Sequence, residues 1–346
     1  MKSPHRQSSN ESDLLAHIFS LAGGINAQEG DVLVGPGDDC AVVRTLSGDR
    51  VLLSVDQLVA GRHFVADTPV DQIARKAVAR SISDIAAMGG TPRWCLATGL
   101  LPDGYTWAKE LSEALLRWGR HWNAPVVGGD IAFGPGPLSL TVTAVGSMDQ
   151  PALPTGASAS PILRSDAHPG DLLWLTGPIG GSFASAHHLH FAPRLDAGWA
   201  AAQANALQTR GESKNRLQKN PVVHAMIDIS DGLGRDAARI GTASGVELVI
   251  EAGSVPVHRD ASGTLLPWRE AFSAGEDYEL LLAIAPEHGQ SQETLPEPLA
   301  RLKPPLLGPI GRVVASVHRT NPPGATIIDP SGNRFNASSF GYDHGQ

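Results

Sequence analysis

Apolar and polar residues alternate along the first half of the chain in a pattern that predicts strands interrupted by two helices. The segment 69–88 has apolar residues at helical spacing and stops at Gly89-Gly90, a usual C-terminal stop for a helix. A second helix is predicted from about 106 to 122. Shorter apolar runs predict strands at 32–34, 40–43, 51–55, 94–101 and 138–145, and one more strand that leads into residues 128–130.

A Gly- and Pro-rich stretch at 148–160 separates this half from the next and predicts a domain boundary. We therefore expect two domains, residues 1–148 and 149–346, each an α+β unit with mixed connections. The polar segment 203–220 is expected to be a solvated helix end or loop. Further strands are predicted at 170–177, in a segment that ends at 228, and at 246–250. Helical segments are predicted from 233 onward and just before 274.

Length and charge limit the classes of function. A chain of 346 residues with 42% hydrophobic content can build the cores of two domains. The net charge of −8 and the lack of a Lys or Arg run argue against a nucleic-acid partner. No apolar stretch approaches the length of a membrane span, and residues 14–21 indicate an amphipathic helix rather than a signal peptide.

The two cysteines, Cys40 and Cys95, form neither a disulfide framework nor a zinc-ligand spacing. We expect both to be small buried hydrophobic residues. This usage is consistent with a reducing cytoplasm, where we expect the protein to be located.

Aspartates beside Gly or Ser recur where apolar runs end. An acid next to a flexible backbone suits an oxygen-ligand site for a hard cation, and phosphates are the usual companions of such cations. For each aspartate alone, a helix cap or a turn is the more common explanation. Two carboxylates about 4 Å apart repel by roughly 4 kcal/mol at an effective dielectric of 20, so a converging set would require a cation. The set comprises Asp38, Asp39, Asp56, Asp84, Asp130, Asp228 and Asp231.

Asp84 has a further reason to be a ligand. It lies in the last turns of the helix predicted at 69–88. A negative charge there opposes the helix dipole, which argues against a purely stabilising role and favours a role as a ligand.

Eight short motifs resemble the thiamine-monophosphate kinase family, and they occur in that family's order from residue 35 to the C-terminus. The family belongs to the superfamily of aminoimidazole-ribonucleotide synthetase and selenophosphate synthetase. The motifs are Gly37–Ala41, Val59–Phe64, Lys76–Gly89, Gly128–Asp130, Leu163–Ser165, Ile227–Leu233, Gly275–Leu280 and Gly341–His344.

The resemblance implies a two-domain α+β synthetase-like fold, with an N-terminal α+β domain that dimerises through its sheet and a C-terminal α/β domain. It implies transfer of the γ-phosphoryl of ATP to thiamine monophosphate, assisted by several Mg²⁺ ions. No dedicated catalytic base is implied, since the second pKa of a phosphate monoester is near 6 and the attacking oxygen is already largely ionised. The implied partners are ATP, thiamine monophosphate and a second copy of the chain.

The same resemblance assigns site residues by position. Val55 stands where the family commonly has Thr, so it would offer only its backbone carbonyl. The implied metal ligands are Asp39, Ser54, Val55, Asp56, Asp84, Asp130, Asp228 and Asp231. The implied ATP contacts are Trp122, Gly129, Asp130, Arg164 and Ser230, and the implied thiamine-side contacts are His63, Glu276 and Tyr342.

Several positions depart from the family pattern or have a second interpretation. Val55, Gln57 and Phe133 replace residues that would offer a hydroxyl or an arginine, which keeps open a related ATP-dependent enzyme with another substrate. A noncatalytic nucleotide-binding homologue is the third possibility. Trp122 fits a core residue at a helix end equally well, and Lys76 and Arg80 fit either phosphate contacts or a solvated helix face.

Overall fold

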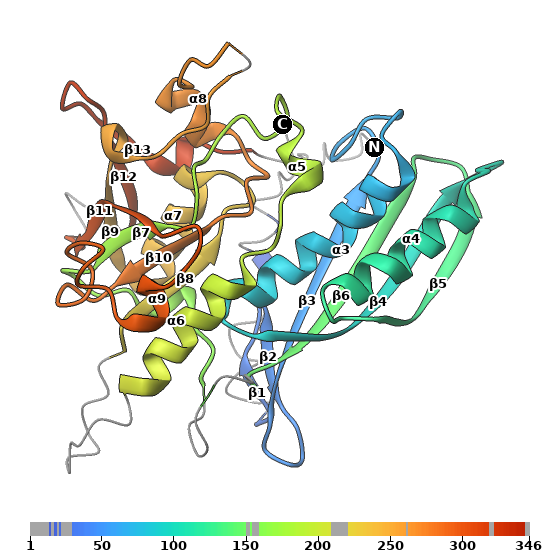
Figure 1. Ribbon diagram of the computed structural model, residues 1–346, viewed down its shortest axis with the longest axis horizontal. Helices are drawn as coiled ribbons and strands as arrows, with labels where there is room; N and C mark the ends of the chain where they lie inside the picture. The colour runs from blue at the N-terminus through green and yellow to red at the C-terminus, as the bar shows by residue number, and fades with distance from the viewer. Residues whose placement is uncertain are drawn as a thin grey trace, which may run out of the picture.

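The computed structural model describes residues 30–149, 159–208, 221–260, 262–317 and 322–342, together with the isolated positions 14, 17, 18, 21 and 153. It contains two sheets, each with helices packed on it (Figure 1). The four described positions of the helix predicted at 14–21 are helical. The remainder of that segment, and most of the polar segment predicted at 203–220, lie outside the described residues.

The first sheet has six strands in the order β1-β2-β3-β6-β4-β5. All neighbouring strands are antiparallel except β4 and β5, which are parallel. Helices α3 (Val70–Ala87) and α4 (Ala108–His121) lie on one face, as Figure 1 shows. The strands are β1 (Val32–Val34), β2 (Ala41–Arg44), β3 (Arg50–Val59), β4 (Thr91–Pro102), β5 (Val126–Gly134) and β6 (Ser139–Ser147).

The second sheet has seven strands in the order β13-β12-β9-β11-β7-β10-β8. Its one parallel pair is β9 with β12. The strands are β7 (Leu172–Leu175), β8 (Val223–Asp228), β9 (Val246–Glu251), β10 (Leu280–Ile284), β11 (Leu307–Ala315), β12 (Gly324–Ile328) and β13 (Arg334–Asn336). The helical segments are η1 (Arg164–Asp166), α5 (His187–His190), α6 (Leu195–Gln208), α7 (Leu233–Ser244), η2 (Ala252–Ser254), α8 (Trp268–Ser273), α9 (Glu297–Ala300) and η3 (Ala337–Ser339).

Helix α3 joins the two halves of the molecule. One hydrophobic cluster runs from the first sheet through α3 to Trp174, Met226 and Leu282 of the second sheet. Helix α6 packs directly on the end of α3: a Cβ at Gly198 would lie 2.1 Å from the carbonyl oxygen of Ala86, so only glycine permits this approach. The C-terminal turns of α3 also lie beside the end of β8, where the Ser83 hydroxyl donates to Asp228.

The face of the first sheet opposite α3 carries large apolar side chains. Leu53 and Trp94 both pair with Val145, and Val55 and Leu96 both pair with Thr143, so these four side chains share that face. Their exposed fractions range from 36% for Leu53 to 65% for Val55. A contiguous apolar surface of this kind is typical of an interface.

The predicted helices at 69–88, 106–122 and from 233 are confirmed as α3, α4 and α7, and the strands predicted over 138–145 and 246–250 as β6 and β9. Three features differ from or add to the prediction. Strand β5 continues through Gly128–Asp130 instead of ending there, and helix α6 and strands β10–β13 were not anticipated. Among the helices that the structure describes, none has both the length and the apolar character needed to cross a bilayer.

Candidate functional site

Three of the predicted aspartates converge where the two sheets meet. Carboxylate oxygens of Asp39, Asp84 and Asp228 all lie within 4.8 Å of one another. Asp39 lies in the turn before β2, Asp84 in the last turn of α3, and Asp228 at the end of β8. We call these three residues the acidic cluster.

Each member of the acidic cluster is held by a neighbour from another element. Arg164 of η1 contacts both oxygens of Asp39, through Nη2 at 2.6 Å and Nε at 3.3 Å. The Ser54 hydroxyl on β3 donates to Asp84, and the Ser83 hydroxyl donates to Asp228 at 2.7 Å. The carboxylates are therefore fixed in place rather than splayed apart by repulsion.

Burial and mutual repulsion change the protonation of this cluster. Burial raises the pKa of Asp84 well above its ordinary value of 3.8, and the charge of Asp56 raises it further. The pKa of Asp228 is also raised, first by burial and then by the charge of Asp39. Without a bound cation, full ionisation of the cluster is therefore costly.

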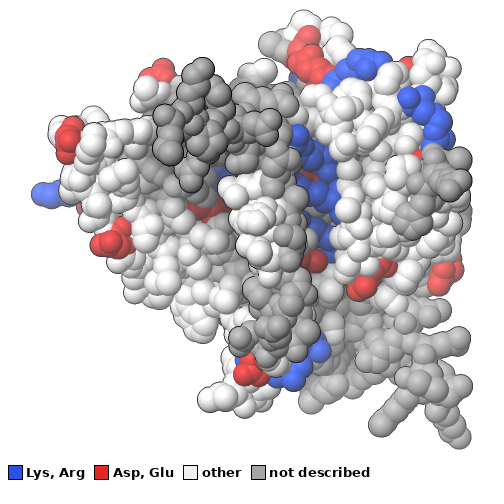
Figure 2. Space-filling view, turned by 180° about the vertical axis from the view of Figure 1, so that it is seen from behind, with Lys and Arg blue, Asp and Glu red and all other residues white. Residues whose placement is uncertain are grey.

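Basic residues on α3 lie beside the acidic cluster. Lys76, Arg80 and Asp84 are spaced four residues apart, which places them on one side of the helix. Arg80 contacts Asp56 at 3.5 Å, and its Nε is buried without a hydrogen-bond partner among the described residues. Lys76 is fully buried, so the alternative of a solvated face is wrong for this residue. Figure 2 shows basic atoms gathered in a hollow between the two lobes of the molecule.

A second group of polar residues surrounds Lys76. Its ammonium contacts Glu276 Oε2 at 2.5 Å and donates to the His63 carbonyl oxygen at 2.6 Å. Burial lowers the pKa of Lys76 to about 8, and the neighbouring Glu276 opposes that shift. Two of the three predicted thiamine-side residues, His63 and Glu276, are thus brought together. The His63 ring accepts a hydrogen bond from the Val59 amide through Nδ1, so it also caps a turn.

Three other predicted residues lie around the loop after β8. Asp231 is ion-paired with Arg239, and its backbone carbonyl accepts a hydrogen bond from the Tyr342 amide at 2.8 Å. The Ser230 carbonyl accepts from the Glu276 amide at 2.7 Å. Glu276 has φ of +69°, a left-handed conformation that costs energy for a non-glycine residue and often marks a functional site. This loop therefore connects the acidic cluster to the Glu276 region.

Asp130 and Gly129 are not part of the acidic cluster within one chain. They lie on β5, which is separated from β3 by β6 and β4, or about 14 Å at the usual strand spacing. Asp130 pairs with Thr98, which shares the uncovered face with Leu96, and its side chain is exposed. A Cβ at Gly129 would lie 1.7 Å from the Ala97 carbonyl oxygen, so no larger residue fits there.

The side chains of Val55 and Trp122 lie outside the acidic cluster. The Val55 side chain is exposed on the opposite face of the sheet, which leaves its backbone carbonyl as the only group available to a ligand. Trp122 is 8% exposed, its ring stacks on Trp118 at 5.3 Å, and the Arg75 guanidinium lies 5.5 Å from its centroid. Its packing is that of a core residue at the end of α4.

Sequence reasoning missed Ser83 and gave too little importance to Lys76 and Arg80. The four-residue spacing of Lys76, Arg80 and Asp84 was the available signal, because it puts both cations on the side of the helix that carries a candidate ligand. No local pattern marks Ser83, since its partner Asp228 is 145 residues away.

Comparison with known proteins identifies related chains. Residues 37–148 match the N-terminal domain of AIR synthase related proteins, and residues 168–302 match the C-terminal domain. The chain is 34% identical over 280 residues to thiamine-monophosphate kinase from Rhodopirellula baltica, which covers 76% of this chain and 80% of the relative. It is 32% identical over 285 residues to thiamine-monophosphate kinase from Salmonella typhimurium, with 79% and 82% covered.

Solved structures share the fold. AaThiL complexed with AMPPCP and TMP superposes with a TM-score of 0.73 at 22% identity, covering 99% of this chain and all of that one. Thiamine-monophosphate kinase from Stenotrophomonas maltophilia K279a superposes with a TM-score of 0.59 at 25% identity, covering 90% and 95%.

The raised pKa of Asp84 predicts how stability depends on pH. The folded state binds this proton more tightly than the unfolded state, so metal-free protein loses stability as the pH rises above 3.8 and through the folded pKa. We expect Asp84→Asn to increase the free energy of unfolding at pH 8 in a chelator by on the order of 1–3 kcal/mol. The gain should shrink toward pH 4. Urea unfolding measures it, with exposed Asp67→Asn as the matched control, and an equal effect of both substitutions would contradict the assignment.

Proposed function

The chain belongs to the thiamine-monophosphate kinase family, and we propose that it transfers the γ-phosphoryl of ATP to thiamine monophosphate, giving thiamine diphosphate and ADP. The observation that carries this proposal is the convergence of Asp39, Asp84 and Asp228 from both halves of the chain. Cationic Arg164 and Arg80 lie next to these acids. Two phosphate groups must be brought together in this reaction, and a site that combines acids with cations is suited to that task.

The donor set fits Mg²⁺, which prefers oxygen ligands and binds through carboxylates and substrate phosphates. The raised pKa values of Asp84 and Asp228 support the fit, because these acids are costly to ionise until a cation lies between them. Bound Mg²⁺ ions would neutralise the phosphates that must approach each other. We propose Asp39, Asp84 and Asp228 as the main ligands, joined by Asp56, by Ser54, by the Val55 carbonyl, and by Asp231 if it exchanges Arg239 for metal.

Arg164 and Arg80 are proposed to orient the phosphates. Arg164 already donates to Asp39 and would offer its remaining N–H groups to an ATP oxygen. Arg80 contacts Asp56, and its buried Nε, which has no hydrogen-bond partner among the described residues, is a further donor there. With the attacking phosphate oxygen largely ionised at neutral pH, alignment and charge neutralisation suffice and no catalytic base is needed.

The thiamine end is proposed to lie at Glu276, His63 and Tyr342. Glu276 is 8% exposed and held by Lys76, so its carboxylate is partly desolvated and interacts strongly with a cationic ring. Thiamine monophosphate carries such a ring in its thiazolium. Ser230 connects this end to the loop that carries Asp231.

The proposed activity is tested by incubating the protein with ATP, Mg²⁺ and thiamine monophosphate and separating the products by chromatography. We expect thiamine diphosphate and ADP in equal amounts, and a loss of at least about 10³-fold in kcat with Asp228→Asn, because an oriented charge is removed from the reacting centre. Asp67→Asn serves as the exposed control. ATP binding without formation of thiamine diphosphate would reject this substrate.

The role of Glu276 is tested by Glu276→Gln, which removes the charge but keeps a polar group beside Lys76. We expect KM for thiamine monophosphate to rise about 10- to 100-fold, the value of one charge-assisted contact, with little change in KM for ATP. Exposed Glu293→Gln is the matched control. Equal changes in both KM values would place Glu276 outside the thiamine subsite.

We also propose that the protein is a homodimer formed through the uncovered face of the first sheet. That face carries Leu53, Val55, Trp94 and Leu96, and Asp130 projects from it. Two sheets packed face to face lie about 10 Å apart, and packing with opposite strand orders would bring β5 of one subunit over the β3 region of the other. Asp130, which is too distant from the acidic cluster of its own chain, would then complete the site of the partner.

Mixing two inactive variants tests this shared site. If Asp130 completes the site of the partner subunit, a heterodimer of Asp56→Asn and Asp130→Asn chains has one site with both native aspartates and one site in which both are substituted. Random mixing should then restore about a quarter of wild-type kcat, because half the dimers are mixed and each has one active site. The two chains are co-expressed with different tags and assayed together, with each variant alone as control. No recovery in verified heterodimers would place Asp130 in the site of its own chain.

A cytoplasmic location is proposed as well. Cys40 and Cys95 are both buried and unpaired thiols, as expected for a chain that folds in a reducing compartment.

A further inference from the structure

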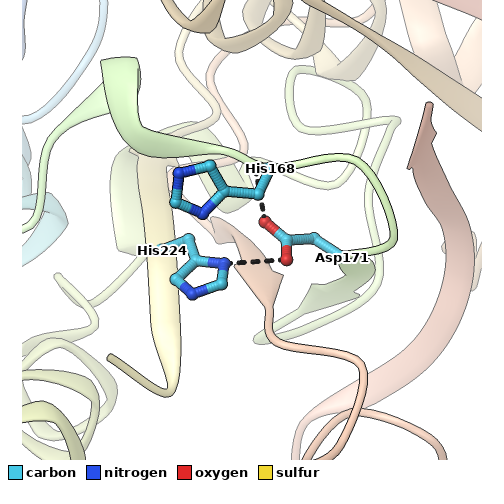
Figure 3. Close-up of side chains that lie close together, drawn as sticks. All are labelled: His168, Asp171 and His224. Atoms are coloured by element: carbon cyan, nitrogen blue, oxygen red, sulfur yellow. Dashed lines mark hydrogen bonds and ion pairs between the residues drawn. The ribbon is translucent and has the colours of Figure 1, made fainter. Parts of the chain in front are cut away.

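A second group of metal-binding side chains lies at the far end of the second sheet from the acidic cluster. His168, Asp171 and His224 each offer a ligand atom, and these atoms all lie within 4.8 Å of one another (Figure 3). His224 is at the start of β8 and Asp228 at its end, so four residues of extended strand, about 13 Å, separate this group from the acidic cluster. The two groups are therefore separate sites.

Asp171 is the centre of this group. Its Oδ1 contacts His224 Nδ1 at 2.7 Å, and its Oδ2 accepts a hydrogen bond from the His168 backbone amide at 2.8 Å. The His168 and His224 rings lie 4.5 Å apart, centroid to centroid, in an edge arrangement. Figure 3 shows both rings on the same side of the carboxylate.

The backbone aims His224 at this group through an irregularity in the sheet. Ala225 pairs with Ala283 and Val223 pairs with the next residue of β10, Ile284. His224 therefore has no partner on β10 and forms a β-bulge. Such a bulge redirects a side chain out of the regular alternation of a strand. It brings His224 to Asp171, 53 positions away in sequence.

The Asp171 side chain is fully buried, and its one ion pair among the described residues is with His224. A buried carboxylate is stabilised by hydrogen bonds and by a nearby positive charge. A cation bound between Asp171 and the two imidazoles would supply such a charge. The exposed His168 favours a cation at this point, because it adds a second imidazole nitrogen within 4.8 Å of the Asp171 carboxylate and the His224 ring.

We propose that His168, Asp171 and His224 bind a divalent transition-metal ion of the zinc class, independently of the phosphoryl-transfer site. Two imidazoles and one carboxylate form a ligand set that suits Zn²⁺, whereas Mg²⁺ prefers an all-oxygen set. Because His168 is exposed, the fourth ligand position is open to water. The ion ties the turn before β7 to the bulge in β8.

The test uses metal-stripped full-length protein titrated with Zn²⁺ against a chromophoric zinc chelator, in excess Mg²⁺ to occupy the acidic cluster. We expect one tightly bound equivalent of Zn²⁺ in the wild type, weakened at least about tenfold by His168→Ala. His168 is exposed, so its substitution leaves the fold intact; His224→Gln should have a similar effect. With Co²⁺ in place of Zn²⁺, the wild type should show visible absorption typical of a four-coordinate ion.

Two matched controls make the result specific. His190→Ala removes another exposed imidazole and should leave zinc binding unchanged, and so should Asp39→Asn, which alters the acidic cluster. The proposal is overturned by three results: no tight equivalent in the wild type, equal affinity in wild type and His168→Ala, or loss of the equivalent in Asp39→Asn.

Discussion

The mutual repulsion of Asp39, Asp84 and Asp228 is the interaction on which the rest of this structure depends. Three carboxylates within 4.8 Å of one another, two of them in buried positions, oppose folding unless they are protonated or neutralised. The structure holds them together with Arg164, Ser54 and Ser83 rather than letting them separate. This arrangement lowers the stability of the metal-free protein, and a bound cation would restore it, as expected of a site organised for catalysis.

Helix α3 makes this arrangement possible because it packs against both sheets. The C-terminal turns of α3 bring Asp84 and Ser83 to the end of β8. The side of α3 that carries Lys76 and Arg80 contacts Glu276 and Asp56, one from each half of the chain. The close packing of Gly198 on Ala86 fixes α6, and with it the second half of the chain, against that helix. A site built in this way exists only when both halves are folded and docked.

The sequence predicted α3, α4 and α7 well, because each depends on local spacing. Short motifs also singled out the candidate aspartates. It could not predict which aspartates meet. Asp39 and Asp228 are far apart in the chain, and Asp130 looked equivalent to them until the strand order placed β5 at the far edge of the first sheet. The His168, Asp171 and His224 group was also invisible in sequence, since a bulge opposite β10 brings it together.

The most direct measurement of the central claim is anomalous diffraction from Mn²⁺ in crystals grown with a nonhydrolysable ATP analogue. We expect metal peaks about 2.1 Å from carboxylate oxygens of Asp39, Asp84 and Asp228, in contact with the analogue's phosphates. Metal peaks confined to other residues, with these three carboxylates contacting only Arg164 and the serines, would contradict a metal site at the acidic cluster.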